Sequence, residues 1–259
     1  MSGFELSKAR CLISGTSSGV GKFLSTKLPF AERYDRSAPI SNYKNQTYDA
    51  IIHCAYGDGF LKGHKNIYEQ SKSNIRLVED LCDINCGVFI FFSSIDVYPR
   101  GFSGSLSDFE LGSGEMLSRH AFFKIIGESI IGSKVKQHLI LRPSLMVGKD
   151  ARASTFVNIV RGSKGPFTLA KKSRFNLITH DQVLFCLQAA LATKTKGAIN
   201  LCSGLELSLD EVARHVSNDN ISWGRFEYQT PKIEGSNTVK FFGGVESNTS
   251  DLISTVLSW

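Results

Sequence analysis

The stretch "RCLISGTSSGVGKFL" (residues 10–24) decides the fold of this chain. Its first six residues form a short apolar run that predicts a buried β-strand, and a helix is expected over residues 19–28. Between them lie Gly15, Gly19 and Gly21. Such a turn lets the backbone approach a pyrophosphate closely, and the helix start offers it unpaired N–H groups. The stretch therefore predicts a dinucleotide site at the end of a first strand.

Other residues near the turn bear on the same ligand. Ser17 and Ser18 can add hydroxyl donors, and Val20 belongs to the same turn. Farther along, at the end of a second predicted strand, stand Asp35 and Arg36. An acidic side chain there would bond the adenosine ribose and favour NAD, whereas an arginine would pair with the 2′-phosphate of NADP. Because both are present, the choice between NAD and NADP stays open.

The rest of the N-terminal half alternates short apolar runs with amphipathic segments. Strands are expected at residues 48–55, 87–98 and 137–148, and a long helix at residues 67–85. Alternation of this kind is typical of a parallel sheet covered by helices. We predict an α/β fold with a Rossmann-like, doubly wound parallel sheet.

The C-terminal half is less regular and predicts a smaller substrate lobe. Helices are expected over residues 153–162, from Asp181 as N-cap to Ala192, and from Ser208, whose spacing to Glu211 fits a capping box. A strand is expected near residue 200. We expect residues 1–148 to form the dinucleotide-binding domain and residues 149–259 to form mainly the substrate lobe, with some segments returning to the core.

Composition narrows the functional classes. The 259 residues are 42% hydrophobic and 21% charged, which suits a globular protein with a large core. No apolar run approaches the roughly 20 residues of a membrane span, and the N-terminus does not resemble a signal peptide. We therefore expect a cytoplasmic protein without a membrane partner.

The charge distribution and the cysteine spacing argue against a nucleic-acid-binding protein and against a metalloprotein. A net charge of +6 favours anionic ligands, but the basic residues are scattered and form no known nucleic-acid-binding module, so we expect no nucleic-acid partner. The six cysteines lie mostly in apolar runs and form no C-x-x-C pair. We expect them to be reduced, and we expect no metal site.

Five further blocks follow the glycine turn in a recognisable order. They are "IIHCAYG" (51–57), "FFSSIDVY" (91–98), "LRPSLMVG" (141–148), "LITHDQVLFCLQAAL" (177–191) and "GAINLCSGLELSLDEVA" (197–213). With the glycine spacing G-x-x-x-G-x-G, they resemble the extended short-chain dehydrogenase/reductase superfamily, and within it the NAD-dependent epimerase/dehydratases and dTDP-4-dehydrorhamnose reductase. The resemblance implies an NAD or NADP cofactor and a nucleotide-sugar or similar polyol substrate. Members of the family often form homodimers, but the sequence leaves the oligomeric state open.

The resemblance also assigns roles to individual residues. It places Ser94 on the family's catalytic Ser/Thr position. The residues that it places along the cofactor, besides the glycine turn, are Cys54, Ala55, Tyr56, Ser93 and Pro143. Independently of the resemblance, a loop as long as residues 99–118 is usually functional, so we expect it to contribute to substrate recognition or to a lid. Its polar candidates are Asp108, Glu110 and Glu115, for which solvated loop charge is the alternative.

The family's catalytic Y-x-x-x-K pair falls in "SRHAFFKIIGE" (118–128), where one of its two residues differs. Lys124 matches the lysine that bonds the nicotinamide ribose, and Glu128 matches as well, but His120 occupies the tyrosine position. Imidazole is a competent acid or base near neutrality, although it reaches less far than a phenol. The neighbouring ammonium should disfavour the protonated ring, so His120 is expected to be a better base than acid.

Two functions follow from these residues. The first is an NAD(P)-dependent oxidoreductase, epimerase or dehydratase with an atypical active site formed by Ser94, His120 and Lys124. The alternative is a non-catalytic relative that binds the dinucleotide and acts as a regulatory or interaction protein.

Overall fold

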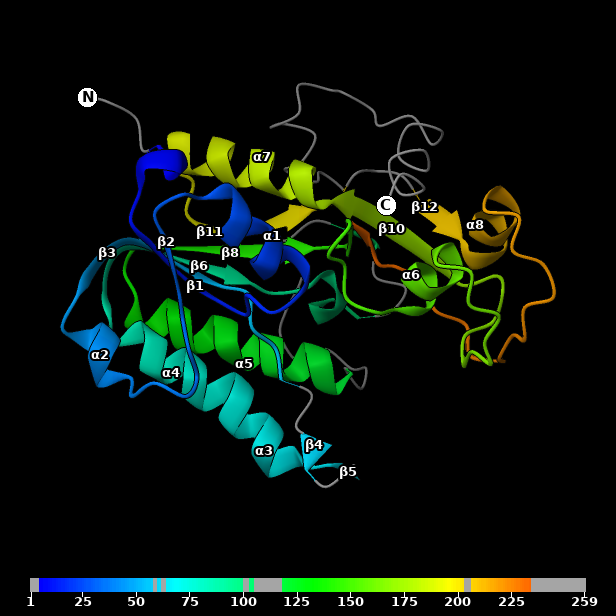
Figure 1. Cartoon of the computed structure of the whole chain (residues 1–259), viewed down its shortest axis with the longest axis horizontal. Helices are drawn as coiled ribbons and strands as arrows, with labels where there is room; N and C mark the ends of the chain where they lie inside the picture. Colours follow the sequence, from blue (N-terminus) through cyan, green and yellow to red (C-terminus); the bar gives the residue numbers. More distant parts are fainter. Residues whose placement is uncertain are drawn as a thin grey trace.

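Six parallel strands form the large sheet of this computed structural model, which describes residues 5–57, 60–61, 64–99, 103–104, 118–202 and 206–233. The order of the strands in the sheet is β11-β8-β6-β3-β1-β2 (Figure 1). Their bounds are β1 (Cys11–Ser14), β2 (Ala31–Arg33), β3 (Thr47–His53), β6 (Asn85–Phe92), β8 (His138–Pro143) and β11 (Gly197–Leu201).

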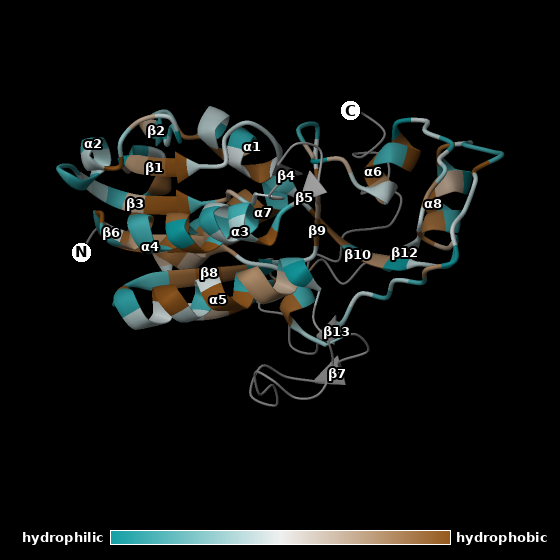
Figure 2. Cartoon of the chain, turned by 90° about the horizontal axis from the view of Figure 1, so that it is seen from below, coloured by the Kyte–Doolittle hydropathy of each residue, from teal (hydrophilic) through white to brown (hydrophobic). Residues whose placement is uncertain are grey.

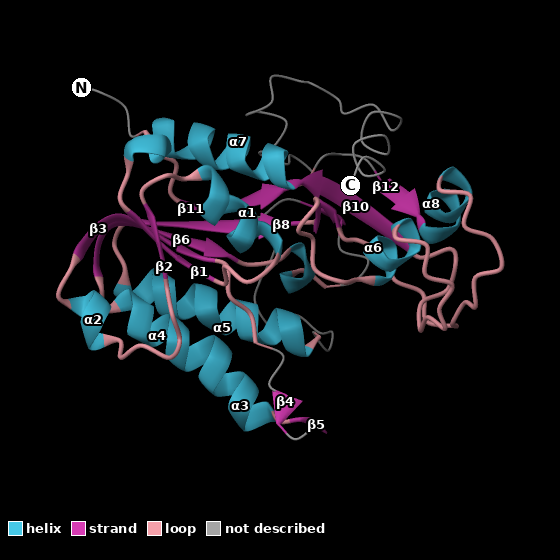
Figure 3. Ribbon diagram, in the orientation of Figure 1, coloured by secondary structure: helices cyan, strands magenta, loops and turns pink. Residues whose placement is uncertain are grey.

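Helices cover both faces of this sheet, which makes it doubly wound (Figure 3). One face carries α1 (Gly19–Lys27) and α7 (His180–Ala192). The opposite face carries α2 (Ser41–Lys44), α4 (Leu77–Cys82) and α5 (Arg119–Lys134). The predicted α/β Rossmann-like architecture is confirmed.

The alternation of side chains along each strand explains the two helical layers. In β1, Cys11 and Ile13 pack in the cluster with α1 and α7, whereas Leu12 packs in the cluster with α4 and α5. In β6, Ile90 and Phe91 divide between the two clusters in the same way. Since neighbouring residues of a strand point to opposite faces, a strand must be apolar where both faces are covered, as residues 11–13 and 89–92 are.

The strand order creates a crevice between β1 and β3. From β1 the chain passes to β2 on one side, and β3 lies on the other side of β1. Ligands of open α/β sheets bind outside the carboxyl ends of the strands at such a reversal. The glycine turn after Ser14 and the segment after His53 both lie at this edge.

A smaller lobe lies beyond the carboxyl edge of the large sheet. Its sheet has the order β12-β10-β9, and Figure 2 shows it beside α6 and α8. The bounds are β9 (Leu145–Val147), β10 (Arg174–Thr179), β12 (Glu206–Ser208), α6 (Thr155–Val160) and α8 (Leu209–His215). Between β10 and β12 the chain returns to the large sheet as α7 and β11.

The predicted helix over residues 67–85 is interrupted. The structure has α3 (Ile67–Ser71), a π-helical segment η2 (Lys72–Arg76) and then α4. The Asn74 side-chain amide donates to the carbonyl oxygen of Gln70 at 2.7 Å and to that of Gly57 at 2.8 Å. A side chain that bonds the backbone four residues earlier competes with the helical ladder, which explains the local widening.

Two predicted strands end earlier than expected. β6 stops at Phe92, because Ser94 caps a short 3₁₀ turn, η3 (Ile95–Val97), by accepting the Asp96 N–H at 3.1 Å. The strand predicted over residues 137–148 is divided at Ser144 into β8 of the large sheet and β9 of the small one.

The helix caps give one correction and one confirmation. Asp181 is not the N-cap of α7, because Thr179 forms a full capping box with Gln182. The capping box predicted for Ser208 and Glu211 is confirmed at the start of α8. Strand β10, just before α7, was not predicted.

The remaining elements are short, and part of one predicted loop is not described. They are η1 (Leu6–Lys8), β4 (Phe60–Leu61), β5 (His64–Lys65), β7 (Ser103–Gly104) and β13 (Lys232–Ile233). The loop candidates Asp108, Glu110 and Glu115 lie outside the described residues. Within the described ranges, no helix is long and apolar enough to cross a membrane.

Candidate active site

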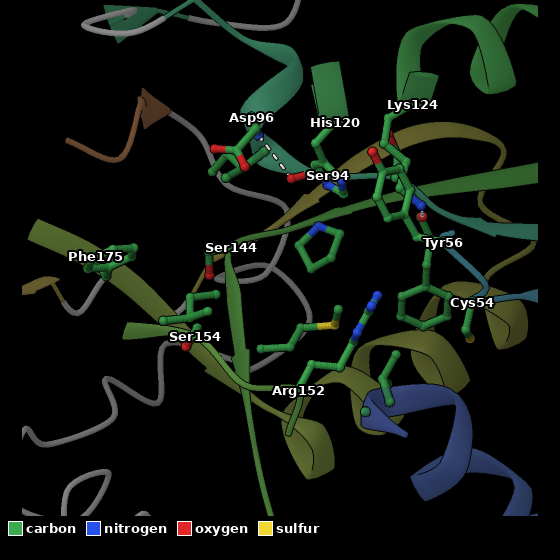
Figure 4. A pocket seen from close by; sticks show the side chains of 18 of the residues that line it. Cys54, Tyr56, Ser94, Asp96, His120, Lys124, Ser144, Arg152, Ser154 and Phe175 are labelled. Carbon is green, nitrogen blue, oxygen red and sulfur yellow. Dashed lines mark hydrogen bonds between the residues drawn. The ribbon is translucent and has the colours of Figure 1, made fainter. Parts of the chain in front are cut away.

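A cavity of about 340 Å³ lies where the carboxyl ends of the large-sheet strands meet the small lobe (Figure 4). A volume of this size falls within the range of small-molecule sites. The sequence-predicted residues that line it are Ser18, Gly19, Val20, Gly21, Cys54, Tyr56, Ser93, Ser94, His120, Lys124 and Pro143. The fold thus brings together residues from five separate segments of the chain.

The glycine turn is packed so closely that two of its glycines cannot be replaced. A Cβ on Gly15, which has a φ of +77°, would lie 2.6 Å from the Ala55 nitrogen. A Cβ on Gly21 would overlap the carbonyl oxygen of Gly15. Gly15 and Ala55 do not line the cavity but fix the crevice between β1 and β3 beneath it.

The segment after β9 lies against the start of α1. The Gly19 N–H donates to the Asp150 carbonyl oxygen at 2.6 Å, and the Lys22 ammonium pairs with the Asp150 carboxylate at 2.6 Å. Arg152 lies beside Gly19 and lines the cavity, with its side chain directed toward the cavity centre (Figure 4). Because the Asp150 carboxylate offsets the charge of Lys22, Arg152 is the residue that adds positive charge beside the helix start, which suits an anionic group.

Lys124 is buried at the inner end of the cavity. Its ammonium donates to the Phe92 carbonyl oxygen at 2.6 Å and lies 4.8 Å from the centre of the Phe91 ring. Burial lowers the pKa of Lys124 to about 8, and the positive charge of Arg152 acts in the same direction, while Cys54 and Glu128 act against it. The end of β6 thus fixes the position of the cation on α5.

His120 lies one helical turn before Lys124 and lines the same cavity. Its ring makes an edge contact with the Tyr56 ring at 4.4 Å between centres. Burial lowers the pKa of His120 to about 3, and the charges of Lys124 and Arg152 add to this effect. The imidazole is therefore neutral near pH 7 and takes up a proton only with difficulty.

The two serines after β6 are used differently. Ser93 donates to the Glu128 carboxylate, so that its hydroxyl belongs to a structural network. Ser94 accepts the Asp96 N–H, and since a hydroxyl has one hydrogen and two lone pairs, its own hydrogen can still be donated into the cavity. Ser94 is thus the serine that can meet a substrate oxygen.

Glu128 holds α5 against β8 through a buried ion pair. Its carboxylate receives two hydrogen bonds from Arg142, at 2.6 and 3.0 Å, and both side chains are about one-tenth exposed. Arg142 also donates to the Tyr98 hydroxyl at 2.8 Å, and Tyr98 donates to Asn200 at 3.1 Å. The glutamate that this chain shares with the family's motif, Glu128, therefore has a structural role.

Asp35 and Arg36 lie outside the cavity, on an exposed turn after β2. The Asp35 carboxylate accepts the N–H and the hydroxyl of Ser37, both at 2.8 Å, and these bonds lower the pKa of Asp35. Ser17 is also exposed and does not line the cavity. The roles of these residues toward a dinucleotide stay predictions.

Several cavity residues were not singled out from the sequence. They include Ser144, Arg152, Ser154, Phe175, His180, Tyr228 and Thr230. All come from the second half of the chain. Ser144 and His180 stand in two of the quoted blocks but were given no role there, and the other five lie outside the blocks. The tertiary structure brings all seven to the cavity. The described residues contain no group of three His, Cys, Asp or Glu that could hold a metal.

The chain was compared with known proteins. No protein-family model and no curated protein matches the sequence. Solved structures match closely over nearly the whole chain. MoeE5 in complex with UDP-glucose and NAD is 15% identical, has a TM-score of 0.76, and the match covers 96% of this chain and 97% of that one.

Two further structures give the same result. UDP-glucuronic acid 4-epimerase from Bacillus cereus, in complex with UDP-glucuronic acid and NAD, is 17% identical with a TM-score of 0.74, over 96% of this chain and 98% of that one. RMD from Pseudomonas aeruginosa, complexed with NADPH, is 17% identical with a TM-score of 0.69, over 96% and 98%. The chain has the fold of the nucleotide-sugar epimerases, so the predicted resemblance is confirmed for the fold.

Proposed function

We propose that this protein is an NAD(P)-dependent enzyme that oxidises or reduces a carbinol carbon of a nucleotide-linked sugar, as an epimerase, dehydratase or reductase. The observation that carries the proposal is the convergence of the glycine turn, Ser94 and Lys124 on one cavity. Two of the similar structures hold UDP-sugars with NAD, and a third holds NADPH. These ligands support the class of cofactor and substrate.

The crevice at the glycine turn fits a dinucleotide. The close packing at Gly15 and Gly21 holds the glycine turn in shape beneath the cavity, and Arg152 beside the start of α1 supplies positive charge for a pyrophosphate. A bound nicotinamide would accept or donate the hydride. NAD and NADP stay equal candidates, because Asp35 and Arg36 both follow β2.

Three side chains at the inner end of the cavity would act on the cofactor and the substrate. Lys124, fixed on the Phe92 carbonyl, would bond the nicotinamide ribose. The Ser94 hydroxyl would donate to the reacting oxygen of the substrate and orient it. His120, neutral and packed on Tyr56, would accept a hydrogen bond at this end of the cavity.

Calorimetric titration with NAD, NADH, NADP and NADPH tests the proposal directly. We expect binding of at least one dinucleotide, and we expect Lys124→Ala and Ser94→Ala to lower turnover of a nucleotide sugar about 100-fold. Lys134→Ala and Ser133→Ala are matched controls, since both residues lie at the exposed end of α5. Failure to bind any of the four dinucleotides would refute the proposal.

A second function is favoured by one observation, the histidine at the family's tyrosine position. A protein with this site could bind the dinucleotide tightly without turnover and present it to a protein partner. His120→Tyr discriminates the two functions: activity that is absent in the wild type and gained in the variant would identify a non-catalytic relative that has lost its phenol.

A further inference from the structure

Asp96 and Tyr228 meet inside the cavity, although 132 positions separate them in the sequence. The Tyr228 hydroxyl donates to the Asp96 Oδ1 atom at 2.7 Å, and both residues line the cavity. Asp96 lies on the turn η3 directly after β6, and Tyr228 comes from the C-terminal segment of the small lobe. The pair thus joins the two lobes at the cavity.

Tyr228 is held by contacts on its ring and on its backbone. The ring stacks on Phe175 of β10, with 4.7 Å between centres and 22° between planes. The Tyr228 N–H donates to the Ser173 hydroxyl at 3.1 Å, and its carbonyl accepts the Arg174 N–H at 2.9 Å. These contacts fix the orientation of the phenol. A side chain that positions a reacting group must itself be held in one orientation.

Asp96 is connected to the predicted substrate-binding serine. Its N–H donates to the Ser94 hydroxyl oxygen at 3.1 Å, so the two residues share one turn. Tyr228 occupies Oδ1, whereas Oδ2 has no hydrogen-bond partner among the residues that the structure describes. That second oxygen is a ready acceptor for a proton beside Ser94.

The other groups at the inner end of the cavity are poorly suited to take this proton. His120 is packed edge-on against Tyr56, and the nearby positive charges of Lys124 and Arg152 disfavour a protonated imidazole. Lys124 donates to the Phe92 carbonyl. The Tyr56 hydroxyl accepts a bond from Gln70 of α3 at 2.9 Å, which directs it toward that helix.

We propose that Asp96 exchanges the proton of the substrate hydroxyl and that Tyr228 positions it for this task. The inference rests on the proposed function. In the oxidation, the C–H bond of the carbinol would break, and a bound nicotinamide would supply the hydride acceptor. The O–H bond breaks, its proton goes to Asp96, and the electron pair left on the oxygen forms the C=O bond. Reduction is the reverse.

Kinetics of four variants test the assignment on a nucleotide sugar that the wild type turns over. Asp96→Asn should lower kcat about 100-fold at unchanged KM, and Asp96→Glu should recover part of this loss. Tyr228→Phe should lower kcat about tenfold, the effect of one hydrogen bond to a charged group. The double variant Asp96→Asn/Tyr228→Phe should be no slower than Asp96→Asn, because the pair acts as a unit.

A spectroscopic measurement on the ligand-free protein tests the pair independently of activity. With tyrosines labelled by ¹³C at Cζ, the Tyr228 signal is assigned by its loss in Tyr228→Phe. Asp96→Asn should shift that signal and leave the others in place. Tyr68→Phe is the matched control, since Tyr68 is 63% exposed on α3 and does not line the cavity.

The outcomes separate the two proposals. If no dinucleotide binds, the proposed function is wrong and the inference falls with it. If a dinucleotide binds and a sugar is turned over, but Asp96→Asn keeps the wild-type kcat or leaves the Tyr228 signal unmoved, only the inference is overturned. Binding without turnover of any nucleotide sugar also overturns the inference and favours the non-catalytic alternative.

Discussion

The Lys124 ammonium donates a hydrogen bond of 2.6 Å to the Phe92 carbonyl oxygen, which joins the middle of α5 to the end of β6. Lys124 is only 4% exposed, and burial lowers its pKa from 10.5 to about 8. A buried cation at such a position costs folding free energy. A residue retained at that cost is a candidate for a functional role.

Lys124→Met should therefore raise stability while it removes function. A pKa lowered from 10.5 to about 8 corresponds to a penalty of about 3 kcal/mol, as an upper bound, at neutral pH. Between pH 10.5 and pH 8 the unfolded chain binds the proton and the folded chain does not, so the penalty grows as pH falls through this window and is constant below it. Urea unfolding at pH 7 and pH 10 measures the difference, which should be larger at pH 7.

Two buried histidines should make the protein sensitive to acid. Burial lowers the pKa of His53 to about 3 and that of His180 to about 4, and the carboxylates near His180 offset this only in part. Below pH 6.5 these histidines are protonated in the unfolded chain but stay neutral in the folded chain. The free energy of unfolding therefore falls as pH falls, by about 2 kcal/mol for each histidine at pH 5. Unfolding of His180→Gln at pH 7.5 and pH 5 should show a smaller loss than the wild type, and an equal loss would contradict this explanation.

Replacement by alanine should change the stability of the protein in opposite directions at Gly21 and at Gly132. Gly21→Ala should cost several kcal/mol, because its Cβ would overlap the Gly15 carbonyl, and should abolish dinucleotide binding. Gly132→Ala, on the exposed side of α5 with no atom near the added Cβ, should stabilise the protein by about 0.5 to 1 kcal/mol. Thermal unfolding of the two variants side by side checks both signs.

The ion pair between Glu128 and Arg142 should matter far more than pairs on the surface. Glu128→Gln leaves the Arg142 charge buried without its partner, and we expect a loss of about 3 to 5 kcal/mol. Glu79→Gln is the matched control, because its pair with Arg76 is exposed and spans 4.0 Å, and it should cost less than about 1 kcal/mol. Similar losses for both variants would show that Glu128 does not hold α5 in place.

The large sheet was predictable because its strands carry strong local signals. The central strands are covered on both faces, so apolar runs such as residues 87–92 stand out, and the glycine turn marks the first crossover. The break at η2 was not predictable, because it depends on Asn74 reaching Gly57 after the chain has folded. Strand β10 was missed because its pairing with β9 and β12 comes from distant segments.

The site was predictable only on its large-sheet side. Ser94, His120 and Lys124 stand in recognisable blocks, and the structure brings them to one cavity. Arg152 and Tyr228 line the cavity because of how the small lobe packs, and their spacing in the sequence does not predict this position. Whether Asp35 and Arg36 meet a cofactor likewise depends on the ligand and stays a prediction.

The path of the chain through the two lobes has a consequence for how the protein can be divided. Among the described strands, β11 pairs with β8 alone, at the edge of the large sheet, and α7 covers one face of that sheet. Both elements nevertheless follow the first strands of the small lobe in the chain. A fragment ending at residue 148 would leave the β8 edge open and the apolar surface under α7 in water. The halves therefore cannot be exchanged as modules between related proteins, and a chimaera would have to carry residues 180–201 together with the N-terminal part.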